Sequence, residues 1–97
     1  KCKPFWGPYS ASKAAVEALA RTWANESERL PLRVISVDPG ATRTAMRAQA
    51  YPGEDPDTLP HPREVADVIA GLTGPGMTET GKLYIVREKR FADYKLP

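Results

Sequence analysis

Residues 33–40 read Arg-Val-Ile-Ser-Val-Asp-Pro-Gly, a short β-branched run that ends in a proline–glycine pair. The apolar character of the run is broken only by Ser36, as expected for a strand whose two faces are both covered in a parallel sheet. Pro39 cannot continue the hydrogen-bonded ladder, and Gly40 allows the backbone to approach a ligand closely. We therefore predict a buried strand at about residues 33–38 that leads directly into a binding loop.

Two threonines follow the proline–glycine pair. Thr42 and Thr44 place hydroxyl groups within hydrogen-bonding reach of anything that binds at the loop. The simpler interpretation is that they cap a loop or a helix, because threonine favours both positions. Both interpretations stay open on the residues alone.

An alanine-rich helix, predicted at about residues 9–29, precedes the strand. Tyr9 and Lys13 stand one turn apart near its start, where Cβ atoms four residues apart are about 5–6 Å from each other. A cation beside a phenol favours the ionised form, and a phenol so placed can act as a general acid or base. The same spacing also fits a solvated tyrosine and lysine, so the surrounding sequence has to decide between the two.

Small residues around Tyr9 and Lys13 leave one side of this helix able to approach another backbone closely. Helical spacing predicts an apolar side made of Val16, Leu19, Ala20, Trp23 and Ala24. Alanine supplies 13 of the 40 apolar residues of the chain, while Leu, Ile, Val and Phe together number 18. The chain alone therefore has a thin core, and we expect its alanine faces to pack against another segment or another chain.

Downstream of the loop, residues 41–60 contain three prolines and are expected to form a long irregular stretch. A second helix is predicted at about 62–73, with Val65, Ala66, Val68, Ile69 and Leu72 on its buried side. A final strand at 82–86 follows, and residues 87–97 are expected to form an exposed tail. The second helix would supply the crossover that parallel strands need, so we predict that the two strands run parallel.

The order of Tyr9-Ser10-Ala11-Ser12-Lys13, the strand and the proline–glycine loop resembles the C-terminal half of a classical short-chain dehydrogenase/reductase. The run from Thr42 to Ala48, with Pro52 and Glu54-Asp55-Pro56 after it, is similar to the bacterial YciK-like subgroup. The resemblance implies an α/β fold: the C-terminal part of a Rossmann-type doubly wound parallel sheet, in the order helix, strand, loop, helix, strand. Residues 1–97 would be a partial domain that carries the catalytic and substrate-binding half.

The resemblance also implies roles for the site residues. Tyr9 would exchange a proton with the substrate carbonyl or alcohol as hydride passes to or from NAD or NADP. Lys13 would favour the ionised form of Tyr9 and bind the nicotinamide ribose. The loop would bind the cofactor through Pro39, Gly40, Thr42 and Thr44, and Tyr9 and Lys13 would share in that binding. In the same family, residues 41–60 would cover the substrate and often order only with ligand, which makes Met46, Ala50, Tyr51 and Leu59 candidate substrate neighbours; a mobile surface connector is the alternative.

Other parts of the family pattern are not found in these 97 residues. None of the seven glycines forms a glycine-rich turn between a strand and a helix near the start, and only eight residues precede Tyr9, too few for the family's serine. We therefore expect the dinucleotide-binding half to be absent from this chain. On that basis the chain alone would be inactive.

Composition excludes several classes of function. A net charge of +2, spread among acidic residues, gives no basic stripe for nucleic acid. Cys2 is the only cysteine and His61 the only histidine, so we expect no disulfide and no metal site, with His61 at a helix entry. No apolar run is long enough to span a membrane, and no export signal is visible, so we expect a cytoplasmic protein.

Two functions remain. The first is a fragment of an NAD(P)-dependent oxidoreductase that interconverts a carbonyl and an alcohol and works as a homo-oligomer. The alternative is a non-catalytic assembly or regulatory module, because in the resembled family the Tyr-x-x-x-Lys helix packs against its counterpart in a neighbouring subunit.

Overall fold

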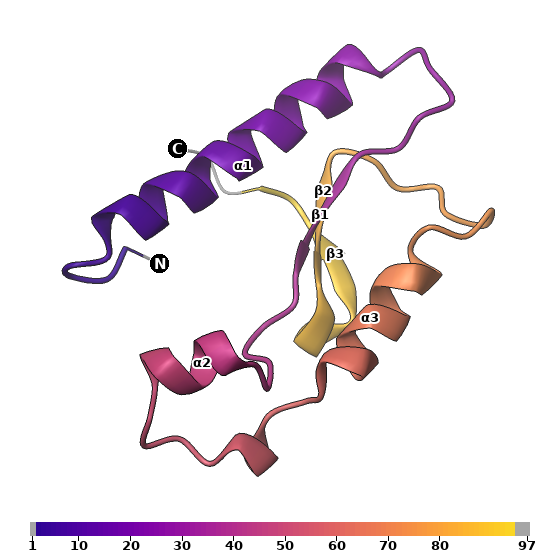
Figure 1. Cartoon of the computed structure of the whole chain (residues 1–97). Coiled ribbons are helices and arrows are strands. Elements are labelled where there is room, and N and C mark those ends of the chain that lie inside the picture. Colours follow the sequence, from indigo (N-terminus) through magenta and orange to yellow (C-terminus); the bar gives the residue numbers. More distant parts are fainter. Residues whose placement is uncertain (1, 95–97) are drawn as a thin grey trace. The chain divides into compact units, whose positions relative to one another are not determined.

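The computed structural model describes residues 2–94. Its elements are, in chain order, α1 (Gly7–Glu26), β1 (Ile35–Asp38), α2 (Ala45–Ala50), the 3₁₀ turn η1 (Pro56–Thr58), α3 (Pro62–Gly71), β2 (Lys82–Ile85), the 3₁₀ turn η2 (Val86–Glu88) and β3 (Arg90–Ala92) (Figure 1). The chain divides into two compact units. Unit 1 comprises residues 1–36, 78–83 and 93–97, and unit 2 comprises residues 37–77 and 84–92.

The three strands form one sheet in the order β1-β2-β3. Strands β1 and β2 run parallel, and β3 returns beside β2 after a tight connection (Figure 1). Just before both parallel strands, the Gly81 amide donates to the Val34 carbonyl at 2.7 Å, and the Val34 amide donates to the Thr80 hydroxyl at 2.9 Å. The predicted parallel pairing of the segments near 33–38 and 82–86 is confirmed, with shorter strands than predicted.

Helix α1 begins at Gly7 with Pro8 in its first turn, where a missing N–H costs nothing. It ends at Glu26, three residues before the predicted end, because the Ser27 amide closes the last turn on the Trp23 and Ala24 carbonyls. A turn that includes a Leu30 amide to Ser27 carbonyl bond at 2.9 Å then carries the chain away from the helix axis.

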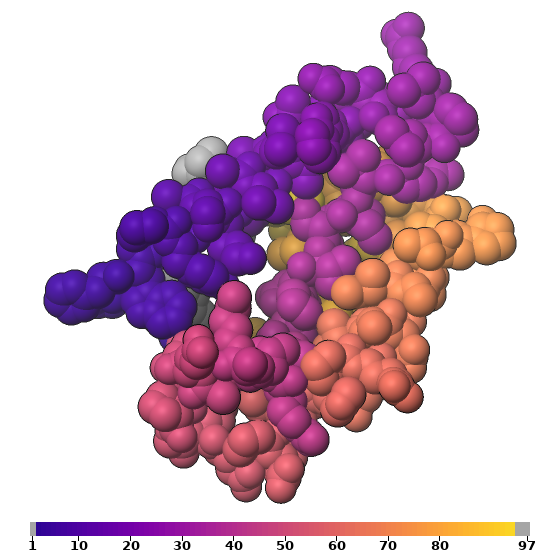
Figure 2. Space-filling model, viewed as in Figure 1, coloured from indigo at the N-terminus to yellow at the C-terminus, as the bar shows by residue number. Residues whose placement is uncertain are grey.

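The predicted apolar side of α1 is only partly correct. Ala24 is 7 % exposed, but Val16, Leu19 and Trp23 are 62, 46 and 51 % exposed. The reason is that the backbone at Gly81 lies close to Ala24: a Cβ atom added to Gly81 would be 3.5 Å from the Ala24 Cβ. The backbone of unit 1 therefore packs on the alanine edge of α1, and the larger side chains a fraction of a turn away stay in solvent. In the space-filling view, other atoms do not cover the face of α1 that is turned toward the reader (Figure 2).

Helix α3 forms where the second helix was predicted, two residues shorter. His61 precedes it, and its Nδ1 accepts a hydrogen bond from the Arg63 amide at 3.1 Å, so His61 is the predicted helix-entry residue. Pro62 and Glu64 occupy the first turn, where proline and an acidic side chain both stabilise a helix. Of its predicted buried side, Val65 is buried, Val68 and Leu72 are half-buried, and Ala66 and Ile69 are exposed.

The C-terminal segment differs from the prediction of an exposed tail at 87–97. Residues 90–92 form β3, because Lys89 adopts a left-handed conformation, with φ 53° and ψ 44°, that reverses the chain after η2. Phe91 then packs edge-on against Tyr84 of β2, with ring centroids 5.0 Å apart. Tyr94 is half-buried, and residues 95–97 lie outside the described part.

The predicted thin core is confirmed. Among the described residues, the buried apolar side chains are Ala24 in unit 1 and Val65 in unit 2, and Ser27 is the buried polar residue. No large apolar side chain among residues 2–94 is fully enclosed. Helix α1 belongs to unit 1, and the loop that follows β1 belongs to unit 2.

Candidate functional site

Tyr9 and Lys13 lie in the first half of α1, one turn apart, as predicted. The Lys13 Nζ stands 5.4 Å from the centroid of the Tyr9 ring, within the range of a cation–π contact. Tyr9 is 49 % exposed, and its carbonyl accepts a hydrogen bond from the Ser12 hydroxyl at 2.7 Å. The helix therefore brings the phenol and the ammonium together on one accessible face of unit 1.

Aromatic packing fixes the other side of the Tyr9 ring. Trp6, just before the helix, meets Tyr9 edge-on, with ring centroids 5.3 Å apart and planes at 86°. The Lys3 Nζ in turn lies 5.4 Å from the Trp6 ring centroid. Edge-to-face packing of this kind restricts ring motion, so Tyr9 is oriented by the residues that precede the helix.

The proline–glycine loop belongs to unit 2. Gly40 has a φ of +72°, in the left-handed region, and its amide donates to the Asp38 Oδ1 at 3.0 Å. The Thr42 hydroxyl donates to the Gly40 carbonyl at 3.2 Å, which tightens the turn after Pro39. A Cβ atom at Gly40 would meet nothing within 4 Å, so the space beside this backbone is open. The loop is thus a shaped turn with room for a bound group.

Thr44 caps helix α2. Its Oγ1 accepts a hydrogen bond from the Arg47 amide at 3.1 Å, which is the capping interpretation left open by the sequence. The cap uses an oxygen lone pair, so the hydroxyl can still donate its proton to a ligand oxygen. Thr44 therefore fits both interpretations at once.

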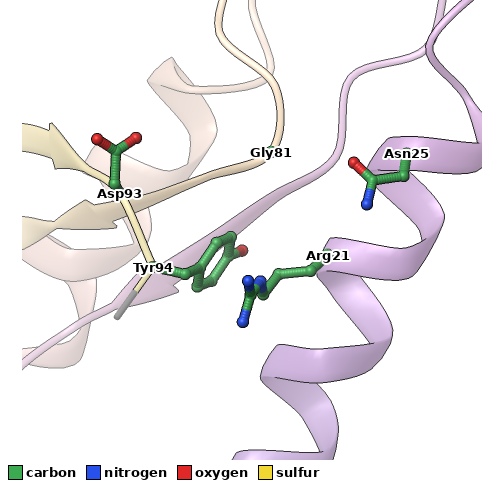
Figure 3. Close-up of a pocket in the computed structure, with 5 residues that line it drawn as sticks. All are labelled: Arg21, Asn25, Gly81, Asp93 and Tyr94. Atoms are coloured by element: carbon green, nitrogen blue, oxygen red, sulfur yellow. The ribbon is translucent and has the colours of Figure 1, made fainter. Parts of the chain in front are cut away.

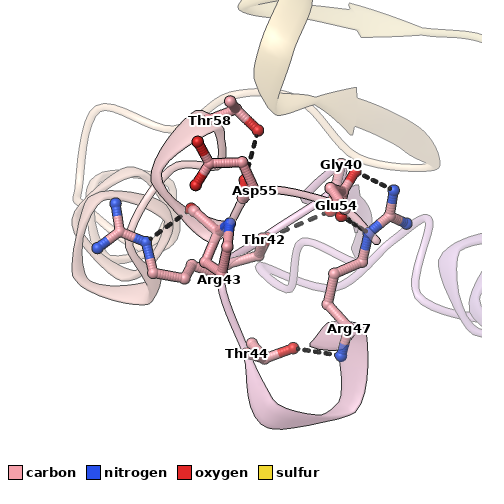
Figure 4. Close-up of polar contacts among 9 residues, drawn as sticks. Gly40, Thr42, Arg43, Thr44, Arg47, Glu54, Asp55 and Thr58 are labelled. Carbon is pink, nitrogen blue, oxygen red and sulfur yellow. Dashed lines mark hydrogen bonds and ion pairs between the residues drawn. The ribbon is translucent and has the colours of Figure 1, made fainter. Parts of the chain in front are cut away.

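Residues 41–60 are more ordered than predicted, since they contain α2 and η1. Two arginines that the sequence analysis did not single out explain the order (Figure 4). The Arg47 guanidinium donates to both carboxylate oxygens of Glu54, with Nε–Oε1 2.8 Å and Nη2–Oε2 3.0 Å. Its Cζ also lies 3.9 Å from the Tyr51 ring centroid. The hydrogen bonds from Arg47 hold the pKa of Glu54 below its usual range, and the same bonds raise the pKa of Arg47.

Arg43 holds the two ends of this loop together. Its amide donates to the Pro60 carbonyl at 3.0 Å, and its guanidinium donates to the carbonyls of Pro56, at 3.0 Å, and Leu59, at 3.3 Å. Asp55 starts η1 by accepting the Asp57 amide at 2.9 Å. The only sequence signal for these contacts is that two arginines occur in a proline-rich segment whose other charged residues are all acidic.

The candidate substrate neighbours occupy different positions in the loop. Met46, on α2, is 75 % exposed, and Ala50 at the end of the same helix is also exposed. Tyr51 and Leu59 are half-buried. The part of unit 2 that carries them is a folded segment, and their contact with a substrate stays a prediction.

Each unit also has a cavity that none of the predicted site residues lines. In unit 1, Arg21 and Asn25 of α1 point toward Tyr94 and Gly81 around a space of about 260 Å³ (Figure 3). The Arg21 guanidinium lies 5.4 Å from the Tyr94 ring centroid. In unit 2, a more apolar space of about 320 Å³ lies between α3 and the β2–η2 segment. Its lining includes Val65, Val68 and Tyr84.

Residues 2–94 show neither a metal-binding cluster nor a membrane-spanning helix. Within residues 2–94, no group of three or more His, Cys, Asp or Glu side chains is arranged to hold a metal ion. In the same range, no helix has the length and apolar character needed to span a membrane.

Comparison with known proteins gives a consistent result. Residues 1–55 match the sequence profile described as short chain dehydrogenase. The chain is similar to the uncharacterized oxidoreductase YciK of Escherichia coli K12, with 45 % identity over 69 residues, which is 71 % of this chain and 27 % of that protein.

Solved structures agree. A short chain dehydrogenase from Salmonella enterica serovar Typhi CT18 superposes with a TM-score of 0.83 at 35 % identity, over 90 % of this chain and 36 % of the other. One from Escherichia coli CFT073, solved in complex with NADPH, gives a TM-score of 0.80 at 38 % identity over the same shares. These matches confirm the predicted fold class. The chain covers 27 to 36 % of the length of each of these three relatives.

Proposed function

Since the chain belongs to the short chain dehydrogenase family, we propose that it carries the catalytic and substrate-binding part of an NAD(P)-dependent oxidoreductase that interconverts a carbonyl and an alcohol. The observation that carries the proposal is the Tyr9–Lys13 pair on one exposed face of α1, with the Lys13 Nζ 5.4 Å from the Tyr9 ring centroid. The family relationship gives this pair its chemical meaning, because spacing alone also fits solvated side chains.

The proline–glycine loop fits the expected cofactor. The open space beside Gly40, and a Thr44 hydroxyl that can still donate, suit a flat ring with a carboxamide. The related protein from Escherichia coli CFT073 was solved with NADPH, which supports a nicotinamide cofactor here. When bound, that cofactor supplies or accepts the hydride. Pro39, Gly40, Thr42 and Thr44 would hold its nicotinamide end.

In this proposal the side chains of α1 handle the proton. The Tyr9 hydroxyl donates its proton to the carbonyl oxygen during reduction and takes it back during oxidation. The positive charge of Lys13 stabilises the phenolate that remains. The edge-on contact with Trp6 holds the ring in place, so that the hydroxyl meets the reacting oxygen in a fixed orientation.

The test is substitution in the full-length protein. Tyr9→Phe keeps the ring and removes the hydroxyl, so kcat with a carbonyl substrate should fall by about 10²–10⁴-fold while cofactor affinity stays nearly unchanged. Lys13→Met should lower kcat and weaken cofactor binding together. Tyr84→Phe, in β2, is the matched control and should leave kcat within twofold. Wild-type turnover in the Tyr9→Phe variant would disprove the catalytic role.

A specific observation also favours the alternative of an assembly module. Val16, Leu19 and Trp23 form an exposed apolar stripe on α1, of the kind that marks protein contacts. If the chain acts only through this stripe, Leu19→Ser should abolish association with full-length relatives, and Tyr9→Phe should change nothing. A fall in kcat in the Tyr9→Phe variant would exclude a purely non-catalytic role for these residues.

A further inference from the structure

We propose that Arg47 and Glu54 are positioning residues that hold α2 and the turn after it as a preformed substrate-binding segment, and that the substrate group recognised there is uncharged. The proposal rests on the proposed function, in which residues 41–60 contact the substrate. It differs from the expectation for a loop that orders only with ligand, because this segment is closed by contacts within itself.

The Arg47–Glu54 pair spans the C-terminal end of α2 and the turn that follows. Two parallel hydrogen bonds of 2.8 and 3.0 Å fix both the distance and the plane of the two groups. Each side chain is 29 % exposed, so the pair is partly shielded from water. Tyr51 lies between the two residues in sequence, and its ring stacks under the Arg47 guanidinium with its centroid 3.9 Å from Cζ. The three side chains therefore act as one cluster.

Arg43 closes the same segment at its base. Its three hydrogen bonds go to the carbonyls of Pro56, Leu59 and Pro60, which lie 13 to 17 residues further along the chain. Proline-rich backbone lacks amide donors, and the arginine supplies donors to carbonyls in that stretch. The contacts of Arg43 join the two ends of the segment 43–60, and the Arg47–Glu54 pair joins two points within it. Each stretch left between these contacts is short, so the segment stays ordered.

The other interpretation of two arginines beside a dinucleotide loop is anion recognition. Arg43 and Arg47 are the only basic residues between positions 41 and 60, which also contain Glu54, Asp55 and Asp57. Arg47 is paired with a carboxylate, and Arg43 is occupied by backbone carbonyls. A substrate carboxylate or phosphate at this segment would meet the net negative charge of its side chains. An uncharged carbonyl compound does not meet that repulsion.

The first measurement is amide hydrogen exchange across residues 44–59 of the full-length protein, without substrate or cofactor. Arg47→Gln and Glu54→Gln should each speed exchange by roughly 3- to 10-fold, the range expected for a bidentate pair. The charge swap Arg47→Glu with Glu54→Arg should recover part of the protection. Arg63→Gln, an exposed arginine of α3, is the matched control and should leave the segment unchanged. Equal exchange in the wild type and both single variants would overturn the proposal.

The second measurement is steady-state kinetics with a neutral ketone or aldehyde and with its carboxylate-bearing analogue. We expect Arg47→Gln and Glu54→Gln to raise KM for the neutral compound by the same 3- to 10-fold, with kcat within twofold and an unchanged cofactor Kd. We also expect the wild type to prefer the neutral compound. The proposal fails if Arg47→Gln selectively loses the carboxylate compound or the cofactor while Glu54→Gln is silent, since that pattern identifies an anion-binding arginine. Because exchange needs no turnover, a failure of the proposed function would leave the first measurement intact.

Discussion

Gly40 offers a quantitative test of the binding loop, because a single methyl group there should strain the folded backbone and also restrict the unfolded chain, with opposite effects on stability. The φ of +72° lies in the left-handed region, where a side chain costs about 1–2 kcal/mol. An added Cβ would meet no atom within 4 Å, so no steric term is expected. Replacing glycine also restricts the unfolded chain, which returns about 0.4–1 kcal/mol. Gly40→Ala should therefore destabilise the fold by up to about 1.6 kcal/mol.

Gly53 provides the matched control. It lies in a turn of the same unit, a Cβ there would also meet nothing within 4 Å, and its φ is outside the left-handed region. Gly53→Ala should therefore stabilise the fold by about 0.4–1 kcal/mol through the unfolded chain alone. Because that unfolded-state effect is common to both variants, the difference between them, about 1–2 kcal/mol, measures the left-handed conformation itself.

The assay is urea unfolding of the full-length protein, read as the free energy of unfolding with the m-value compared between variants. Gly40→Asn should cost less than Gly40→Ala, because asparagine tolerates the left-handed region. Cofactor affinity is measured on the same samples, and an approach of the cofactor to this backbone predicts weaker binding in both Gly40 variants. Equal stabilities for Gly40→Ala and Gly53→Ala would refute the conformational argument. Unchanged cofactor affinity would refute the assigned contact.

Two further predictions concern the ends of the structure and its response to acid. The Tyr94 hydroxyl forms a 2.6 Å hydrogen bond with the Ser36 Oγ and donates to the Lys82 carbonyl at 3.3 Å, so Tyr94→Phe should lower the free energy of unfolding by about 1 kcal/mol. Ser36→Ala should add little in the Tyr94→Phe background, and a fully additive double variant would contradict a shared bond. The pKa of Glu54 is lowered by its hydrogen bonds from Arg47, so the stability from this pair is complete above the ordinary glutamate pKa of about 4.3 and is lost as the pH falls through the lowered folded-state value. The free energy of unfolding, measured from pH 7 down to pH 3, should therefore fall less steeply in Glu54→Gln than in the wild type. Parallel pH profiles for the two proteins would contradict the pairing.

The sequence predicted the elements well where one physical signal dominated. The run before Pro39 had a single interpretation, because β-branched residues that end at a proline–glycine pair fit a strand and its loop and little else. Pro62 and His61 likewise marked the start of α3, since proline suits a first helical turn. Boundaries were less accurate, and α1 ended three residues early because the Ser27 amide closed the last turn on the helix carbonyls.

The order within residues 41–60 could not be predicted from local sequence. Three prolines argue for irregular backbone, and no short-range pattern shows that Arg43 reaches the carbonyls of Pro56, Leu59 and Pro60. Contacts between a side chain and a backbone group 13 or more residues away form only when the intervening loop closes, and local secondary-structure propensities carry no information about that closure. The same is true of β3, which depends on Lys89 accepting a left-handed conformation that lysine rarely adopts.

Helix α1 shows why an amphipathic pattern can be identified correctly and still be assigned the wrong partner. Its sequence meets three requirements at once: a small edge at Ala24 for the approach of Gly81, a phenol–ammonium pair at Tyr9 and Lys13, and an apolar stripe of larger side chains. Helical spacing alone assigns the small edge at Ala24 and the stripe of larger apolar side chains to the same face of the helix. The structure separates them, because only an alanine-width edge fits against the backbone of unit 1. The larger side chains, about half exposed, are the surface through which the proposed assembly module would act, and they lie on the same helix as the proposed catalytic pair.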